Sequence, residues 1–332
     1  MTFFRAFRIH NDDAGYRAGI EMMNNDALSP GEVLIKVAYS SVNYKDALAG
    51  TGNGRILRRY PLNGGIDVAG RVVASTDPAF KEGDAVLCTG SGLSETRDGG
   101  YAQYARLDAR WTIPLPSGLS LRESMIIGTA GFTAALALWR MQDNRQTPAL
   151  GPIAVTGASG GVGQLAIEIF SRAGYEVHAI SGKADHFDVL RELGASVCID
   201  RHQLAFSGKP MDSVRFGGVL DNVGSTMLAG LLPLIHPYGN VAICGNAGGI
   251  EFASTVMPFI IRGASLLGVA SAGTARDIRD KLWQRLASEW KPRQLDRIAT
   301  SEIGLDELSS VFPRMLAGDS FGRSLVHIDG TI

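Results

Sequence analysis

Three glycines in the middle of this sequence have the spacing of a phosphate-binding turn. Gly157, Gly160 and Gly163 follow the short apolar run Ile153–Thr156 and open a helical pattern at residues 162–173. Without Cβ atoms they permit a tight turn and a close approach of the backbone to a diphosphate. The helix start directs free N–H groups and the positive end of its dipole at phosphate oxygens. The pattern predicts a dinucleotide-binding turn, rather than a plain glycine-rich turn, with cofactor contacts from Ser159, Gly160, Gly161 and Val162.

The residues after the next strand bear on which dinucleotide is bound. An NAD site usually has an acidic residue at the end of the second strand, for the ribose 2′-hydroxyl. Here the strand at 175–180 runs instead into Ser181-Gly182-Lys183, and Arg201 follows the third strand. A hydroxyl and two cations favour a 2′-phosphate. We therefore predict NADPH as the cofactor; the alternative is that Lys183 is a solvated surface lysine and that Asp185 serves the ribose.

The turn belongs to a region in which short apolar segments alternate with helical patterns. Strands are predicted at residues 153–156, 175–180, 197–199, 218–222, 240–244 and 265–269, and helices at 162–173, 184–193, 227–235 and 274–290. This alternation predicts an α/β domain with a doubly wound parallel sheet of six strands, the Rossmann arrangement. Because ligands lie beyond the carboxyl ends of such strands, we expect Asn246, Ile260 and Ser271 to line the nicotinamide half of the cofactor site.

The first 120 residues have a different texture. Short segments rich in β-branched and apolar residues, at 33–39, 68–74, 81–88 and 100–107, are bounded by Gly, Pro and Asp. They predict a barrel-like β domain. Ser120-Leu-Arg-Glu123 is a capping-box pattern that predicts a helix start, and residues 130–141 continue as an apolar helix. Residues 324–328 again have the pattern of a strand, which we expect to return to the first domain.

The composition limits the class of protein. The chain has 332 residues, enough for two domains, and its 32 basic and 33 acidic residues give a net charge of −1. This balance argues against nucleic acid or a membrane surface as a partner. No uninterrupted apolar run of about 18 residues is present, so no transmembrane helix is predicted. The three cysteines are widely scattered, which argues against a disulfide framework, and we expect a cytoplasmic location.

Several motifs together give the chain a family resemblance. They are Ser41-Val-Asn-Tyr-Lys-Asp-Ala-Leu48, Arg58-Arg-Tyr-Pro61, Gly65-Ile-Asp-Val-Ala-Gly70, Ile127-Gly-Thr-Ala-Gly-Phe-Thr-Ala134, the glycine turn, Thr255-Val-Met-Pro-Phe-Ile260 and Gly322-Arg323. With them the chain resembles the zinc-free branch of the medium-chain dehydrogenase/reductase superfamily, and within it the acryloyl-CoA reductase, or quinone-oxidoreductase-like, subfamily. The sequence departs from the family pattern at Gly64, where a Pro is usual, and in the loop of residues 91–98, where a Trp is usual.

The resemblance implies a domain organisation and an assembly. A GroES-like β-barrel substrate domain is expected to comprise residues 1–122 and 296–332, and a Rossmann NADP(H)-binding domain residues 123–295. A homodimer formed through the sheet edge near the sixth strand is also implied. No metal is predicted, because zinc-dependent relatives place a Cys near the position of Asn43 and a His-Glu pair near Ile66-Asp67, and this chain has neither thiolate nor imidazole there.

The function implied by the resemblance is NADPH-dependent reduction of an activated C=C bond, that of acryloyl-CoA, to give propanoyl-CoA. Tyr44 is expected to position the nicotinamide or to donate a proton. Asn43 and Asp67 are expected to act with it in catalysis, or else to fix the wall of the site by hydrogen bonds. Further cofactor contacts are expected from Thr129 and Arg323.

Other readings of the charged residues and of the function stay open. Arg55, Arg58 and Arg59 are expected to bind the phosphates of CoA, although a run of three arginines is also typical of a solvated surface. Lys45 and Asp46 have the pattern of an exposed charged pair on a helix. A quinone reductase is one alternative function, favoured if the altered 91–98 loop opens the cleft. A non-catalytic NADP(H)-binding protein is the other.

Overall fold

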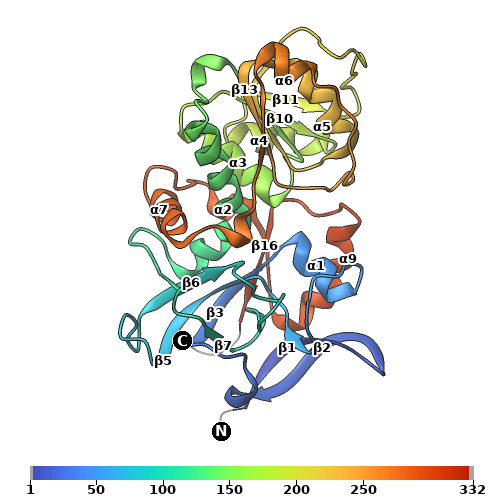
Figure 1. Cartoon of the computed structure of the whole chain (residues 1–332). Helices are drawn as coiled ribbons and strands as arrows, with labels where there is room; N and C mark the ends of the chain where they lie inside the picture. Colours follow the sequence, from blue (N-terminus) through green and yellow to red (C-terminus); the bar gives the residue numbers. More distant parts are fainter. Residues whose placement is uncertain (1–2, 329–332) are drawn as a thin grey trace. The chain divides into compact units, whose positions relative to one another are not determined.

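The computed structural model describes residues 3–328, which form two compact units. Unit 1 comprises Met1–Thr129, Ala272–Ala287 and Leu295–Ile332, and unit 2 comprises Ala130–Ser271 and Ser288–Gln294. Both ends of the chain, blue and red in Figure 1, therefore belong to unit 1.

The structure differs from the predicted domain boundary at helix α7 (Arg276–Leu286), which we had assigned to the nucleotide domain and which belongs to unit 1. The reason is its buried face. Arg279 is 1% exposed and its Nη1 donates to the backbone oxygen and to Oγ1 of Thr89, both at 2.9 Å. Arg279 thus attaches this helix to the end of a strand of unit 1, and Arg276 adds a bond from its Nη1 to the oxygen of Arg110.

Unit 1 is built on two β-sheets. A three-stranded sheet has the order β2-β1-β4, and a seven-stranded sheet has the order β15-β16-β3-β5-β6-β8, with β7 pairing to β3. The strands are β1 (Phe3–Asp12), β2 (Gly15–Asn24), β3 (Val33–Val42), β4 (Leu62–Asn63), β5 (Asp67–Ser75), β6 (Ala85–Thr89), β7 (Tyr104–Leu107), β8 (Ile113–Pro114), β15 (Ala299–Ile303) and β16 (Arg323–His327). The predicted return of the tail is confirmed, because β16 pairs antiparallel with β3 from Ser324 opposite Val42 to His327 opposite Tyr39.

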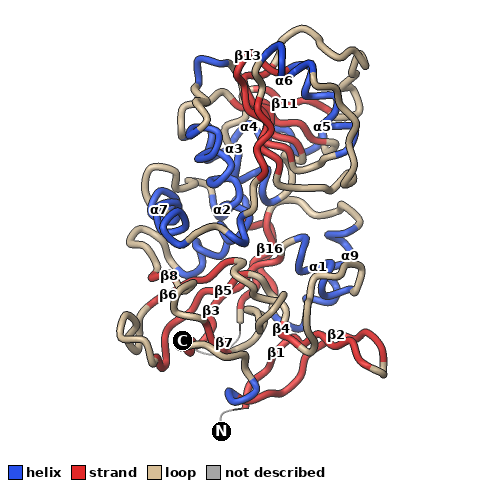
Figure 2. Tube along the Cα trace, viewed as in Figure 1, coloured by secondary structure: helices blue, strands red, loops and turns tan. Residues whose placement is uncertain are grey.

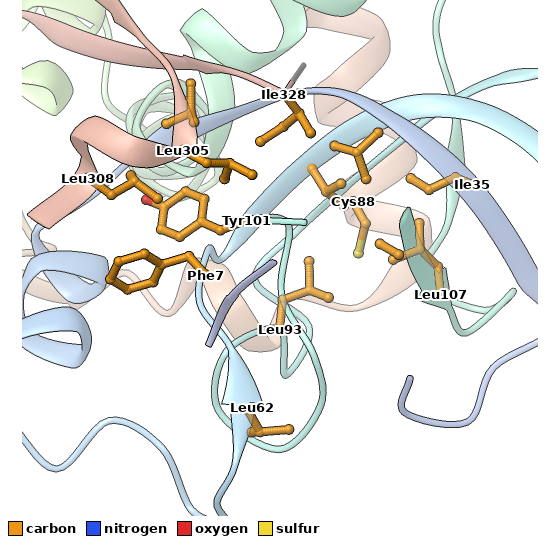
Figure 3. Packing of buried hydrophobic residues seen from close by; sticks show 14 of the residues in the cluster. Phe7, Ile35, Leu62, Cys88, Leu93, Tyr101, Leu107, Leu305, Leu308 and Ile328 are labelled. Atoms are coloured by element: carbon orange, nitrogen blue, oxygen red, sulfur yellow. The ribbon is translucent and has the colours of Figure 1, made fainter. Parts of the chain in front are cut away.

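Helices complete unit 1, and an aromatic core packs one of them against β1. They are α1 (Tyr44–Thr51), α7, α8 (Leu295–Ile298) and α9 (Leu308–Leu316). Phe312 of α9 packs edge-on to Phe7 of β1, with ring centroids 5.7 Å apart, and Tyr101 lies 6.3 Å from both rings. Figure 3 shows Phe7 and Tyr101 among the buried aliphatic side chains of this cluster. A Cβ at Gly50 would lie 2.2 Å from the Phe312 ring, so α1 and α9 approach closely there.

Unit 2 contains the predicted doubly wound sheet. Its six strands are all parallel and have the order β11-β10-β9-β12-β13-β14. They are β9 (Ile153–Thr156), β10 (Val177–Ser181), β11 (Val197–Asp200), β12 (Phe216–Asp221), β13 (Ile235–Ile243) and β14 (Ser265–Gly268). The strand order reverses between β9 and β12, so right-handed crossovers place α3 (Gly161–Arg172) and α5 (Ser225–Leu231) on opposite faces, as seen in Figure 2. The remaining helices of this sheet are α4 (Phe187–Glu192) and α6 (Met257–Arg262).

Helix α2 (Leu121–Asp143) begins at the predicted capping box. Ser120 N donates to Glu123 Oε2 and Glu123 N donates to Ser120 Oγ, at 2.8 and 3.1 Å. Gly128, with φ +48° and ψ −154°, interrupts the helical backbone. The helix is long and apolar enough to cross a membrane, but 83% of its most apolar window is buried within the protein, as in a core helix.

Candidate functional site

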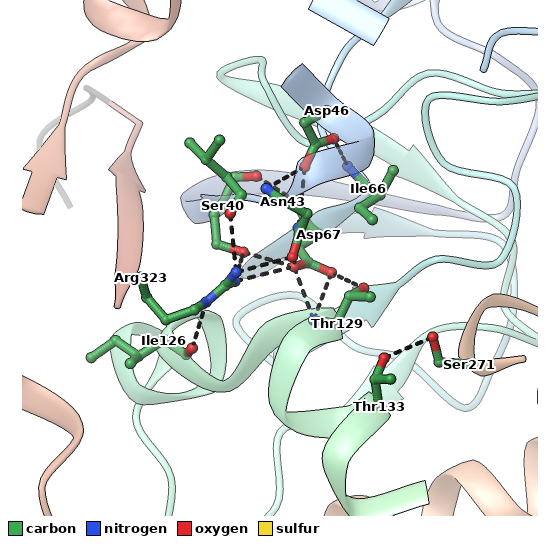
Figure 4. A network of polar contacts seen from close by, with 12 residues as sticks. Ser40, Asn43, Asp46, Ile66, Asp67, Ile126, Thr129, Thr133, Ser271 and Arg323 are labelled. Atoms are coloured by element: carbon green, nitrogen blue, oxygen red, sulfur yellow. Dashed lines mark hydrogen bonds and ion pairs between the residues drawn. The ribbon is translucent and has the colours of Figure 1, made fainter. Parts of the chain in front are cut away.

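A buried carboxylate organises the polar residues of unit 1 around the start of α1. Asp67, the first residue of β5, has no exposed surface. Its oxygens accept hydrogen bonds from Ser41 Oγ (2.7 Å), from Asn43 Nδ2 (2.8 Å), and from both the backbone N (3.0 Å) and Oγ1 (2.6 Å) of Thr129. Figure 4 shows Asn43, which precedes α1, and Thr129 of α2 beside the carboxylate. Because Asp67 is enclosed by its donors, it can fix the positions of neighbouring groups but cannot touch a bound ligand.

The cation of this network is Arg323, at the start of β16. Its Nε donates to the oxygen of Ile126, its Nη1 to the oxygen of Val42 and to Oδ1 of Asn43, each at 3.0 Å. Its Nη2 donates to Ser41 Oγ at 2.6 Å and lies 3.7 Å from Asp67 Oδ2. The side chain is 3% exposed. We had expected Arg323 to contact the cofactor; this expectation is wrong, because its donors are directed into unit 1 and the side chain is buried.

A second buried carboxylate secures the first turn of α1. Asp46 Oδ2 accepts from the N and Nδ2 of Asn43, at 2.9 and 3.1 Å, and its Oδ1 accepts from Ile66 N at 2.9 Å. Burial, and then the negative charge of Asp67, raise the pKa of Asp46 to about 7. The amide of Asn43 thus bridges Asp46 and Asp67. Asp46 was expected to form an exposed pair with Lys45, which is wrong: Asp46 is 2% exposed, and Lys45 pairs with Glu95.

Tyr44 is the exposed residue next to the buried network of Asn43, Asp46 and Asp67. It is the first residue of α1, directly after Asn43, and its side chain is 43% exposed. The backbone on which it stands is held by the Asn43–Asp46 capping interactions, whereas its phenol faces outward. Among the three residues predicted to be catalytic, Tyr44 is therefore available to a ligand, and the buried Asn43 and Asp67 support it.

The three arginines predicted to bind substrate phosphates lie in the loop between α1 and β4. Arg55, Arg58 and Arg59 are all exposed. The guanidinium of Arg59 donates from Nη2 to Ser29 Oγ at 2.6 Å, and the backbone N of Arg58 donates to the oxygen of Glu95. Because the three arginines are exposed, they agree with both alternatives, a phosphate-binding site and a solvated surface segment.

In unit 2 the glycine turn has the geometry expected of a phosphate cradle. Gly157 has φ +57°, which a residue with a side chain rarely adopts. A Cβ at Gly163 would lie 2.4 Å from the oxygen of Gly157, so the helix start can pack against the turn only without a side chain there. Gly160 precedes the first residue of α3, a helix of 12 residues. The N-terminus of α3 is thus aimed at the turn, as diphosphate binding requires.

The three residues predicted to read the 2′-phosphate, Ser181, Lys183 and Arg201, come together at the ends of β10 and β11. Lys183 N donates to Ser181 Oγ at 3.1 Å, and Arg201 N donates to the oxygen of Ser181 at 3.0 Å. A Cβ at Gly182 would lie 2.5 Å from Arg201 Nε, so the guanidinium lies over this glycine. Arg201 and the half-buried Lys183 put two cations at the edge where the ribose of a nucleotide bound at the glycine turn would lie. Asp185, the alternative partner of the ribose, is exposed in the next turn.

The residues expected at the nicotinamide half are dispersed over three segments. Asn246 is exposed after β13, Ile260 is 67% exposed on α6, and Ser271 Oγ accepts from Thr133 Oγ1 at 2.9 Å. Sequence reasoning missed a buried cluster at the carboxyl ends of β9 and β12. There Thr156 Oγ1 donates to Asp221 Oδ1 at 2.7 Å, and Gly224 N donates to Asp221 Oδ2 at 2.7 Å. An aspartate that ends a predicted parallel strand was the signal available for it.

Comparison with known proteins gives matches over nearly the whole chain. The family model described as alcohol dehydrogenase GroES-like domain matches residues 29–117, and the one described as zinc-binding dehydrogenase matches residues 161–288. The chain is 42% identical to YhfP of Bacillus subtilis, whose name describes a quinone oxidoreductase, over 98% of this chain and 99% of that protein. It is 38% identical to the acrylyl-CoA reductase AcuI of Ruegeria pomeroyi, over 98% of this chain and 99% of that protein.

Solved structures agree with these matches. The crystal structure of Escherichia coli K-12 YHDH with bound NADPH is 40% identical and has a TM-score of 0.93, covering 98% of this chain and 100% of that one. The crystal structure of Bacillus subtilis yhfP with NAD bound is 42% identical and has a TM-score of 0.94, with the same coverage. The two relatives were thus solved with different dinucleotides.

The second family model refers to zinc, and the donor set of this chain does not fit that metal. Catalytic zinc is held by three side chains from Cys, His and carboxylate residues. Within residues 3–328 no group of three or more His, Cys, Asp or Glu side chains is placed to hold a metal ion. At the positions where zinc-dependent relatives are expected to have ligands, this chain has the amide of Asn43 and the aliphatic side chain of Ile66. Neither is among the usual ligands of zinc. Asp67, their neighbour, already accepts hydrogen bonds on both oxygens.

Proposed function

We propose a function from the premise that this chain belongs to the medium-chain dehydrogenase/reductase superfamily, in the subfamily of acryloyl-CoA reductases and quinone-oxidoreductase-like proteins. It is an NADPH-dependent oxidoreductase acting on C=C bonds. We propose that its substrate is a short 2-enoyl-CoA thioester, acryloyl-CoA, which it reduces to propanoyl-CoA. The full-length likeness to an acrylyl-CoA reductase carries the choice of substrate.

Unit 2 holds the cofactor. The glycine turn and the start of α3 bind the diphosphate, and Ser181, Lys183 and Arg201 bind the 2′-phosphate. When bound, NADPH supplies a hydride to the β-carbon of the alkene, which the thioester carbonyl makes electrophilic. The relative solved with NAD shows that the fold also admits the other dinucleotide in that protein. The two cations are therefore the residues on which the preference for NADPH depends.

Unit 1 supplies the groups that act on the substrate. Negative charge moves to the thioester oxygen as the β-carbon is reduced, and a hydrogen-bond donor there lowers the barrier. We assign that role to the exposed phenol of Tyr44, which could also deliver the proton that the α-carbon takes up. Asn43, Asp67 and Arg323 hold the backbone that carries Tyr44. Replacement of Tyr44 by Phe keeps the ring and removes only the hydroxyl, so it should lower kcat more than it changes Kd for NADPH.

The test of the substrate is a comparison of electron acceptors. NADPH oxidation should be supported by acryloyl-CoA with a higher kcat/KM than by benzoquinone. Turnover of the quinone with none of the thioester would overturn the proposal and select the quinone reductase, a reading favoured by the name of the relative that is 42% identical. Tight binding of NADPH without turnover of either acceptor would select the non-catalytic reading.

We further propose that two copies of the chain associate through unit 2. Strand β14 lies at one edge of the six-stranded sheet, so one of its sides has no partner strand within the described residues. Seven exposed apolar side chains lie on β13, β14, α6 and the segment between β13 and α6, and we propose that they form one apolar patch: Tyr238, Ile250, Phe252, Val256, Ile260, Ile261 and Leu266. An edge strand and an apolar patch together are typical of an interface. In this proposal Ile260, which was expected to contact the cofactor, is instead a residue of the dimer interface.

The cytoplasmic location of the protein stays a prediction.

A further inference from the structure

A cavity of about 280 Å³ in unit 1 lies outside the Asp67 network. Five polar side chains line it: Arg8 from β1, Ser29 from the segment before β3, Arg59 and Tyr60 from the loop before β4, and Asp98. Two guanidinium groups on one small cavity are costly to place together without a compensating anion. The charge of Asp98 is the first candidate for that anion.

Asp98 compensates the charge of Arg8, with which it forms an ion pair, but no acidic side chain of the cavity wall pairs with Arg59. The residue is 3% exposed, and its Oδ2 accepts from the N and the Oγ of Ser29, both at 2.7 Å. Its Oδ1 accepts from Asn63 N at 2.9 Å, and Arg8 Nη1 lies 3.6 Å from the same oxygen. These three donors satisfy the carboxylate, and the nearest guanidinium nitrogen remains beyond hydrogen-bond distance.

Most of the donors of the two arginines remain for a ligand. Arg8 uses Nη1, towards Asn63 Oδ1 at 3.1 Å and Met23 Sδ at 3.6 Å, and Arg59 uses Nη2, towards Ser29 Oγ. The other guanidinium nitrogens of Arg8 and Arg59 have no hydrogen-bond acceptor within residues 3–328. Two planar forks with free N–H groups match the oxygens of a phosphate group.

We propose that this cavity binds a phosphate group of the CoA portion of the substrate. The inference rests on the proposed function, which supplies a substrate that carries phosphates. Asn63, which contacts Arg8 and Asp98 of the cavity wall, and Asp67, which contacts Asn43 next to Tyr44, are four residues apart. Their Cα atoms are therefore separated by at most about 14 Å. The pantetheine arm of CoA can span such a distance, with the thioester at Tyr44 and a phosphate at Arg8 and Arg59. Of the three arginines in the loop, the geometry selects Arg59 and leaves Arg55 and Arg58 outside.

The experiment compares acryloyl-CoA with an acryloyl thioester that is truncated to the cysteamine end of CoA and therefore lacks the phosphates. Arg59→Gln should raise KM for acryloyl-CoA by about tenfold, as expected for the loss of one charge-assisted hydrogen bond. KM for the acryloyl thioester of N-acetylcysteamine, which lacks phosphates, should change by less than about twofold, because this ester cannot reach the cavity. Arg314→Gln, at an exposed arginine on α9, is the matched control and should change neither value. An equal rise for both esters, or an unchanged KM for acryloyl-CoA, would overturn the inference.

A binding measurement separates this inference from the proposed function. Adenosine 3′,5′-bisphosphate carries the 3′-phosphate and the first 5′-phosphate of CoA without the reacting thioester. Calorimetry should show that it binds the wild type and that Arg59→Gln weakens this binding. Inorganic phosphate that competes as well as the bisphosphate would overturn the assignment to CoA. Binding through Arg59 in a protein that fails to reduce acryloyl-CoA would support the site and contradict the reaction.

Discussion

Replacement of Gly128 by alanine should destabilise unit 1 by about 4 kcal/mol, through backbone strain and overpacking. Its backbone, at φ +48° and ψ −154°, is one that a residue with a Cβ adopts at a cost of about 1–3 kcal/mol. The added Cβ would lie 2.6 Å from Asp67 Oδ2, 2.8 Å from Arg323 Nη2 and 3.0 Å from Ser41 Oγ. Arg323 Nη2 donates a hydrogen bond to Ser41 Oγ, and Ser41 Oγ donates one to Asp67 Oδ2, so none of the three atoms can move away from the methyl group without breaking a bond. Overpacking therefore adds about 1–3 kcal/mol to the loss of stability. The sum is about 4 kcal/mol.

Because the chain has two units, the free energy is best measured locally by hydrogen exchange rather than by one unfolding curve. A loss of about 4 kcal/mol raises the population of the open form roughly a thousandfold, which should appear as faster exchange in peptides that cover β3 and α1. Gly19→Ala in β2 is the control, because its Cβ would meet no atom within 4 Å and its φ is ordinary. Exchange in Gly128→Ala within a factor of about 5 of wild type, or about 1 kcal/mol, would refute the strain assigned to this position.

Three further outcomes are expected. Lys183→Ala should weaken NADPH about tenfold and NADH less than about twofold by calorimetry, because only the 2′-phosphate needs the cation; equal losses would contradict this. The pKa of Asp46 in the folded state, about 7, lies above its ordinary value of 3.8, so the folded protein holds more protons between these values and its stability falls as the pH rises through that window. The unfolding free energy of the wild type should therefore fall relative to that of Asp46→Asn by up to about 4 kcal/mol from about pH 4 to about pH 8. A difference that does not change with pH would show that Asp46 does not titrate in this range. Ile261→Asp places a carboxylate in the apolar patch and should convert a dimer into a monomer in sedimentation velocity, whereas a monomeric wild type would contradict the proposed association.

The nucleotide unit could be predicted from sequence because its signals are local. Each strand of the sheet is a short apolar run. The glycine pattern that indicates dinucleotide binding lies within seven residues, at 157–163. The same locality allowed Ser181 and Lys183 to be placed together, since both follow one strand. Arg201 needed the additional premise that neighbouring strands in sequence pair in the sheet, which β10 and β11 do.

The supporting network of unit 1 could not be predicted, because it joins residues far apart in sequence. Arg323 and Ser41 are 282 positions apart, and no pattern in either segment indicates the other. The burial of Asp46 did have a local signal, since Asn43 followed three residues later by an acid is a capping pattern. The adjacent Lys45 made the pair look like surface charge. A charged residue at the third position of a helix is ambiguous until its neighbours in space are known.

The position of Arg323 after unit 2 in the sequence sets an order of assembly during synthesis. Unit 2 ends at Gln294, so its sheet can close before β16 has been made. Asp67 and Ser41 are made early, but the guanidinium that pairs with them is made after the whole of unit 2. The residues that hold the start of α1 therefore obtain their final partner only when β16 is added. A nascent chain that ends before Arg323 would have a complete unit 2 and an incomplete support for Tyr44.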